Sequence, residues 1–340
     1  MKYNWIIIPA ILLFIIAIAL VYNISNFLWK EPVLSYHSKD LRNYRYHFVM
    51  ITKDTEESYW NKALESALRV AKERKAALEY YGPRFSDLKE LERFLEMTVL
   101  SNVDGILVSV PNEINLKTLI NEAAAKKIPV VALANDIDDT KRTSFVGVNA
   151  YDLGFKTGQA LTQAVTGAIK VAVLVNSNFS AYSYQRYLQG IKDVIEGYPG
   201  LQLTLILTSK GSSISAEEQT QSILKNYPEI QAIICSNASD TLGVAKVVVD
   251  LNRVTHVTII GSGLTPEIAN YINRGVIWGV LADDPDELGA QGMNTMIKIK
   301  EGIIIQQHYD MPIYLINKNN LNVYSPKLIP PEKNADHESK

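Results

Sequence analysis

Short apolar segments rich in β-branched residues alternate along most of the chain with longer amphipathic segments. In the longer segments apolar residues recur at helical spacing, which predicts helices, as in the stripe Ala63, Leu64, Ala67, Leu68 and Ala71. The short segments predict buried strands and lie at Tyr46–Thr52, Gly105–Val110, Pro129–Asn135, Phe145–Asn149, Lys170–Asn176, Leu203–Thr208, Ala232–Asn237, Val257–Gly261 and Trp278–Asp283. This alternation predicts an α/β fold with parallel sheets covered by helices on both faces.

Polar residues stand at the ends of several predicted strands, namely Asn135, Asp136, Asn149, Asn176, Asn237 and Asp283. In open parallel sheets, ligands bind outside the carboxyl ends of the strands. Amides and carboxylates there suit a ligand with many hydroxyl groups, because each hydroxyl both donates and accepts hydrogen bonds. For any one of these residues, capping the next helix or forming a turn is an alternative role.

The first thirty residues contain a continuous apolar segment, Trp5–Tyr22, interrupted only by Pro9. Its 18 residues would extend about 27 Å as a helix, close to the roughly 30 Å of a bilayer core. Aromatic residues at both ends, with Trp29 beyond, suit the membrane interfaces. We therefore expect a single-pass transmembrane anchor over residues 1–30.

A cleaved signal peptide is the alternative interpretation of this segment, and Ala17 and Ala19 form a small-residue pair like those at cleavage sites. The pair lies inside the apolar segment instead of after it, which favours an uncleaved anchor. Residues 31–44 are polar and mixed, and we interpret them as a linker. Basic residues beyond the anchor leave its orientation open.

Composition excludes several functions. Lys and Arg total 34 against 36 Asp and Glu, so no extended basic surface for nucleic acid is predicted. Cys235 is the only cysteine and the five histidines are scattered, which argues against a disulfide or a zinc site. Gly261-Ser262-Gly263 lacks the spacing of a hydrolase elbow and the last glycine of a dinucleotide-binding motif. We expect no metal, no cofactor and no catalysis.

From about residue 46 to residue 317 the chain resembles the type I periplasmic sugar-binding proteins of the ribose-, xylose- and galactose-binding kind. The residues that carry the resemblance are Asp104–Val108, Lys127–Val131, Tyr151–Gly154, Gly158, Gln231–Ile233, Ser236, Asn237, Gly243, Ile260, Gly261, Asp283–Pro285, Leu288 and Gly289. The resemblance implies two Rossmann-like lobes joined by a three-crossing hinge, with the ligand held between them. It also places the domain outside the cytoplasm, on the cell membrane.

The resemblance implies an N-terminal lobe over residues 45–148 with 284–311. The C-terminal lobe is expected over residues 149–283 with 312–325. Proline and charged residues dominate the remainder, so we expect a disordered tail over residues 326–340.

The resemblance also implies roles for individual residues. Tyr59 and Trp60 occupy the place of an aromatic pair that stacks on the sugar ring, with core packing at a helix start as the alternative. Asn237 and Asp283 match polar positions of the family. Where the family has Asp-Arg after the strand 129–133, this chain has Asn135 and Asp136. The full expected ligand-binding set is Tyr59, Trp60, Asn135, Asp136, Asn149, Arg186, Asn237 and Asp283.

Three functions follow from this pattern. The leading one is a membrane-anchored binding protein for a small sugar-like ligand, which closes on the ligand and signals to a sensor histidine kinase. The second is the binding component of an ABC importer, with its permease as partner. A Rossmann-like enzyme is a more distant alternative. A transcription regulator would need a DNA-binding helix-turn-helix of about sixty residues before the core, where residues 1–44 hold an apolar segment instead.

Overall fold

The computed structural model describes residues 44–328, except residues 54, 56, 57, 84–86, 112, 178 and 211. The predicted anchor, the predicted linker up to residue 43 and the predicted tail from residue 329 lie outside the described residues. Among the residues that are described, no helix combines the length and the hydrophobicity needed to cross a bilayer.

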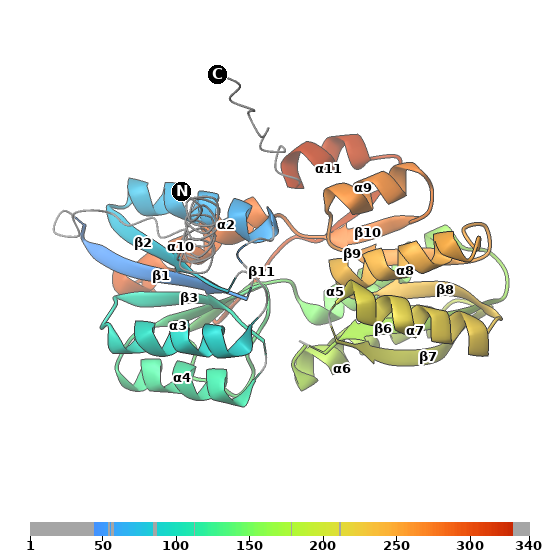
Figure 1. The fold of residues 1–340 in the computed structure, drawn as a ribbon. Coiled ribbons are helices and arrows are strands. Elements are labelled where there is room, and N and C mark those ends of the chain that lie inside the picture. The colour runs from blue at the N-terminus through green and yellow to red at the C-terminus, as the bar shows by residue number, and fades with distance from the viewer. Residues whose placement is uncertain are drawn as a thin grey trace, which may run out of the picture. The chain divides into compact units, whose positions relative to one another are not determined.

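The first lobe is a six-stranded sheet in which every pair of neighbouring strands is parallel. Its strands, in sheet order, are β11 (His308–Asp310), β5 (Ser144–Gly147), β4 (Val130–Leu133), β3 (Gly105–Ser109), β1 (Tyr46–Thr52) and β2 (Ala76–Tyr81). Helices cover both faces (Figure 1) and are α2 (Ser58–Glu73), α3 (Leu88–Leu100), α4 (Ile114–Ala125) and α10 (Pro285–Lys300).

The second lobe repeats this plan with one antiparallel edge strand. Its sheet order is β12 (Tyr314–Asn317), β10 (Gly279–Ala282), β9 (Thr258–Ser262), β8 (Ile230–Cys235), β6 (Ile169–Asn176) and β7 (Leu201–Ser209). Only the pairing of β12 with β10 is antiparallel among these described strands. The helices are α5 (Ala150–Ala164), α6 (Ala181–Glu196), α7 (Ser213–Asn226), α8 (Ala238–Asp250), α9 (Pro266–Asn273) and α11 (Leu321–Leu328).

The alternation of side chains along β1 shows why helices cover both faces of the first sheet. Phe48 and Met50 pack into the core under α2 and α10, whereas Val49 and Ile51 pack into the core under α3 and α4. Successive strand residues point to opposite faces, so a strand that is apolar at every position needs a cover on each side.

Glycines allow the close approach of two helix pairs. A Cβ atom at Gly289 of α10 would lie 1.8 Å from the carbonyl oxygen of Ala63 in α2. In the second lobe, a Cβ at Gly154 of α5 would lie 2.0 Å from the carbonyl oxygen of Tyr187 in α6. Gly154 and Gly289 both belong to the residues that carry the family resemblance, and their role is in packing the helices.

The chain passes between the two sheets three times: from β5 to α5, from β10 to α10 and from β11 to β12. This confirms the predicted two-lobe α/β fold with parallel sheets. The crossings begin at the carboxyl ends of β5, β10 and β11, so the residues just after these strands lie at the boundary between lobes. Asn149 and Asp283 are two of them.

The sequence pattern missed three strands and set one boundary too early. β2 has Glu79 in its middle and β11 is short and polar, so neither presents a continuous apolar segment. β12 is the antiparallel edge strand, and the apolar segment Met311–Ile316 was a local signal for it that was missed. Helix α11 ends at Leu328, so its last three residues fall within the predicted tail, residues 326–340.

Candidate functional site

A pocket of about 460 Å³ opens at the carboxyl ends of the strands of both sheets. Residues following β4, β5 and β11 contribute one side, and residues following β8, β9 and β10 contribute the other. Seven of the eight residues expected to bind ligand line it: Tyr59, Asn135, Asp136, Asn149, Arg186, Asn237 and Asp283. Trp60 does not line it.

Trp60 packs in the hydrophobic core under α2 with only 2% of its surface exposed, so its expected stacking on a ligand is corrected. Its ring makes an edge contact with Tyr59, with centroids 5.0 Å apart and planes at 84°. Consecutive residues of a helix point about 100° apart, so both rings cannot face the same pocket. Of the predicted aromatic pair, Tyr59 alone lines the pocket.

Tyr59 and Asp283 form a direct contact at the pocket. The hydroxyl of Tyr59 in α2 donates to Oδ2 of Asp283 at 2.5 Å, and Asp283 stands at the crossing from β10 to α10. Burial raises the pKa of the Asp283 carboxyl above its ordinary value, while the hydrogen bond from Tyr59 acts in the opposite direction. A carboxylate oxygen accepts several hydrogen bonds, so Asp283 retains acceptor capacity for a ligand hydroxyl.

A strained turn at the end of β4 presents Asn135 to the pocket. Ala134 has a φ of 61°, and the backbone N–H of Asn135 donates to the carbonyl oxygen of Leu133 at 2.7 Å. A hydrogen bond across one residue with positive φ is the pattern of a γ-turn, which is rare and costly for a residue with a side chain. The turn places Asn135 just outside the sheet edge.

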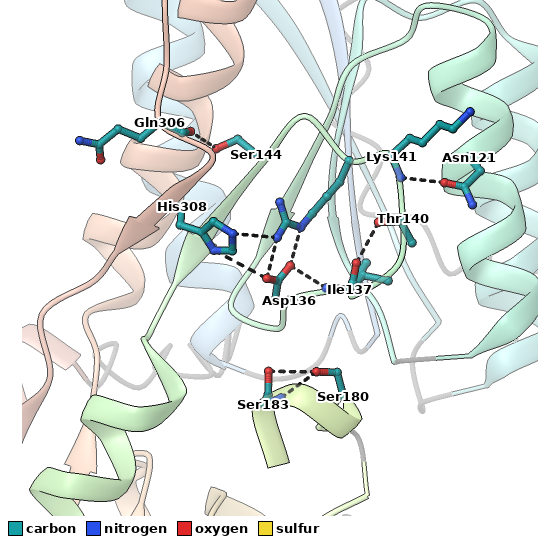
Figure 2. Close-up of polar contacts among 11 residues, drawn as sticks. Asn121, Asp136, Ile137, Thr140, Lys141, Ser144, Ser180, Ser183, Gln306 and His308 are labelled. Carbon is teal, nitrogen blue, oxygen red and sulfur yellow. Dashed lines mark hydrogen bonds and ion pairs between the residues drawn. The ribbon is translucent and has the colours of Figure 1, made fainter. Parts of the chain in front are cut away.

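Asp136 has protein partners on both of its carboxylate oxygens. Oδ1 pairs with Nε of Arg142 and accepts from the backbone N–H of Ile137 at 2.8 Å, and Oδ2 accepts from Nη2 of Arg142 at 2.6 Å. Nδ1 of His308 lies 3.8 Å from Oδ2, and Figure 2 shows this ring beside the carboxylate. The bidentate pairing neutralises the charge of Asp136 and orders the pocket wall.

Asn149 and Asn237 both cap helices, as the alternative interpretation of strand-end amides anticipated. Oδ1 of Asn149 accepts from the backbone N–H groups of Tyr151 at 3.0 Å and Asp152 at 3.3 Å. Oδ1 of Asn237 accepts from the backbone N–H of Asp240 at 2.9 Å. Capping fixes the orientation of each amide, and both residues line the pocket while they cap.

Asp240 supports Asn237 from behind and is fully buried. Its Oδ2 accepts from the Oγ of Ser209 at 2.6 Å and from Nδ2 of Asn237. Its Oδ1 has no hydrogen-bond partner among the described residues. Burial raises the pKa of this carboxyl to about 6, although the two donated hydrogen bonds oppose the shift.

Arg186 of α6 brings a positive charge to the pocket wall. Its guanidinium lies over the ring of Tyr151, 4.6 Å from the centroid, a stacking arrangement that restrains the side chain. Nearby, the hydroxyl of Ser180 caps α6 by accepting from the N–H of Ser183 at 3.0 Å (Figure 2). Both serines line the pocket, so α6 contributes hydroxyl groups as well as a charge.

Sequence reasoning missed several residues that shape the site, chiefly Arg142, Asp240 and His308. Asp240 follows Asn237 at capping-box spacing, which is a local signal. His308 lies far from Asp136 in sequence, and no local pattern joins the two. Within the described ranges, no three His, Cys, Asp or Glu side chains are grouped as a metal site.

Solved structures with the same architecture include one named for binding sugars. A glucose-galactose binding protein of Geobacillus stearothermophilus, GanP, is 31% identical, with a TM-score of 0.77 over 81% of this chain and 98% of that chain. A chain of the XylFII-LytSN complex is 26% identical, with a TM-score of 0.71 over 80% of this chain and 98% of that chain.

Curated proteins give the same result by sequence. The D-allose-binding periplasmic protein of Escherichia coli K12 is 20% identical over 267 residues, which cover 76% of this chain and 86% of that protein. The family profile described as a periplasmic binding protein domain matches residues 48–303, well over half of the chain. This protein therefore belongs to the periplasmic binding protein family, with a domain that is similar to those of sugar-binding members.

Proposed function

We propose that this protein binds a small sugar or sugar-like ligand between its two lobes, outside the cytoplasm, and reports the bound state to a membrane partner. The observation that carries the proposal is the pocket at the strand ends of both lobes, with Tyr59, Asn135, Asn149, Arg186, Asn237 and Asp283 in its lining. A ligand there would contact groups from both lobes at once.

The size and chemistry of the pocket suit a monosaccharide. A volume of about 460 Å³ falls within the roughly 300–1,000 Å³ of small-molecule sites. The ring of Tyr59 offers an apolar surface for sugar C–H groups. Amides, serine hydroxyls and the Asp283 carboxylate offer donors and acceptors for the hydroxyl groups.

Closure of the lobes on the ligand is the mechanism that we infer. A ligand that bridges both lobes stabilises the arrangement in which both contact it, and so shifts the population toward that state. The contact between Tyr59 of α2 and Asp283 at the β10–α10 crossing joins a first-lobe helix to a crossing segment. A ligand hydroxyl bound to Asp283 would therefore act directly on a hinge segment.

A sensor histidine kinase is the partner that we favour, with residues 1–30 as the membrane anchor. The resemblance to anchored members of this kind supports it, and XylFII, a similar protein, forms a complex with LytSN. The alternative is delivery of the ligand to an ABC permease. The similar proteins are named for binding and not for catalysis, which supports a role other than that of an enzyme.

A thermal-shift screen tests the proposal. The full chain, purified in detergent, is heated with pentoses, hexoses, polyols, nucleosides and furanosyl compounds at millimolar concentration. We expect one sugar class to raise the melting temperature, because a ligand that binds only the folded state stabilises it. The proposal would be contradicted if no sugar raised the melting temperature while a different class of compound did.

A further inference from the structure

An exposed isoleucine loop lies between α10 and β11 in the first lobe. The side chain of Ile304 is 98% exposed and that of Ile303 is 50% exposed. Isoleucine is among the residues most often buried in soluble proteins, and two adjacent exposed ones form an apolar surface that nothing in the described part of the chain covers. We call Ile303 and Ile304 the isoleucine loop.

The loop stands beside the point where the chain enters the described domain. Nη1 of Arg45 lies 3.5 Å from Oε1 of Glu301, which is separated from the loop by Gly302 alone. The backbone N–H of Arg45 donates to the carbonyl oxygen of Lys75 in the turn before β2. The predicted linker, residues 31–44, reaches at most about 50 Å when fully extended, so a membrane anchor in residues 1–30 would tether the domain by this edge within that distance of the bilayer.

Basic side chains lie along the same amino-terminal edge of the sheet as the loop. Because all strands of this sheet are parallel, the segments before β1, β2, β3 and β4 meet at that edge together with the end of α10. These segments carry six basic residues: Arg45, Arg74, Lys75, Lys126, Lys127 and Lys300. Against them stand Glu73, Asp104, which pairs with Lys300 at 3.0 Å, and Glu301. The edge is therefore positive by about three charges (6 − 3) on a chain whose net charge is −2.

We propose that this edge of the first lobe rests on an anionic phospholipid surface, with Ile303 and Ile304 entering the headgroup region and the basic side chains facing lipid phosphates. Apolar side chains inserted beside a cluster of Lys and Arg are the combination that binds anionic membrane surfaces. The proposal rests on the membrane attachment in the proposed function, and it adds which face of the domain meets the lipid.

This orientation has a consequence for the ligand site. The isoleucine loop lies before β11, and the pocket is lined by residues of β11 itself, beginning with His308. His308 follows Ile304 by four positions, which span at most roughly 14 Å in an extended chain. The first lobe would then be held against the membrane, with this wall of the pocket within that distance of the loop and the second lobe left to move.

Site-directed fluorescence on the full chain in nanodiscs tests the proposal. Cys235 is the only native cysteine and is fully buried, so an introduced surface cysteine takes the label. Ile304→Cys carries an environment-sensitive dye, and Ile214→Cys, a 68% exposed isoleucine of the second lobe, is the matched control. The nanodiscs contain phosphatidylcholine and phosphatidylglycerol at 7:3, with and without quencher-labelled lipid, and pure phosphatidylcholine serves for comparison.

We expect the dye at position 304 to shift to the blue in anionic nanodiscs and to be quenched at least fivefold more than the dye at position 214. Arg74→Glu with Lys75→Glu should reduce this quenching by at least half. Equal quenching at both positions would overturn the proposal, as would a blue shift that depends on protein concentration in detergent, which would indicate a second copy of the chain. A chain that does not co-purify with the nanodisc would overturn membrane attachment itself, whereas sugar binding would be unaffected.

Discussion

Asp240 and Asn237 are joined by two hydrogen bonds at the start of α8. The backbone N–H of Asp240 donates to Oδ1 of Asn237 at 2.9 Å, and Nδ2 of Asn237 donates to Oδ2 of Asp240. Asn237 lines the pocket, whereas Asp240 is fully buried behind it. A buried carboxyl therefore sets the orientation of an amide that lines the pocket.

The burial of Asp240 predicts a pH-dependent stability. Its pKa is about 6 in the folded protein against an ordinary 3.8, so the folded state holds the proton more tightly than the unfolded state. The contribution of Asp240 to the free energy of unfolding is thus fully present below about pH 4 and is lost as the pH rises through 6. Two pKa units correspond to about 3 kcal/mol.

Urea unfolding of the wild type and of Asp240→Asn between pH 4 and pH 7 measures this contribution. The variant cannot titrate at this position, so the difference in unfolding free energy between the two proteins isolates Asp240. We expect the wild type to lose on the order of 2–3 kcal/mol relative to the variant over this range. Parallel pH profiles would show that Asp240 titrates normally.

Coupling between Asp240 and Asn237 should be visible in ligand affinity. Asn237→Ala removes the pocket amide, and Asp240→Ala leaves the amide without its support, so each variant should bind the ligand about tenfold more weakly, or about 1.4 kcal/mol. The double variant should bind little worse than Asn237→Ala, because the two residues act through one group. If calorimetry showed that the two losses of binding free energy add in the double variant, Asp240 would affect ligand binding independently of Asn237.

Trp60 should govern stability and not ligand contact. It is 2% exposed and packs in the core under α2, so Trp60→Ala should destabilise the fold by about 3–5 kcal/mol. Trp60→Phe keeps most of the ring and should cost much less. Chemical denaturation measures both free energies of unfolding. If Trp60→Ala kept normal stability but lost affinity for the ligand, Trp60 would have to contact the ligand after all.

The pairing of Arg142 with Asp136 predicts an asymmetric response to substitution. Both side chains are 12% exposed, so Arg142→Met leaves a largely buried carboxylate without its partner and should lower the unfolding free energy by about 3 kcal/mol. Adding Asp136→Asn removes the charge and should restore much of that loss. Chemical denaturation of the single and double variants measures these changes in unfolding free energy. A double variant that is less stable than Arg142→Met alone would contradict this account.

Much of the fold was predictable because the strands of buried parallel sheets are apolar at every position, as Phe48, Val49, Met50 and Ile51 show. The strand-end residues were predictable for the same reason, since a polar residue after such a segment must lie at the sheet edge. Trp60 was misplaced although a signal existed: it precedes Ala63, Leu64 and Ala67 at helical spacing and so belongs to the apolar stripe of α2.

The residues that pair with Asp136 could not be predicted from the sequence. Arg142 pairs with it across a loop whose path no periodicity specifies, and His308 comes from an edge strand 172 positions later. Such contacts depend on how the chain, after the second crossing and α10, brings β11 back to the first sheet. Only the three-dimensional arrangement brings these residues together.

Calorimetry of the full chain with the sugar selected by the thermal screen tests the central claim most directly, by comparing the wild type with Asp283→Ala and Asp250→Ala. Asp283 lines the pocket beside Tyr59, whereas Asp250 is an exposed aspartate at the end of α8 and does not line the pocket. We predict that Asp283→Ala weakens binding at least tenfold, about 1.4 kcal/mol, and that Asp250→Ala binds like the wild type. Equal affinity in all three proteins would show that the ligand does not bind in this pocket.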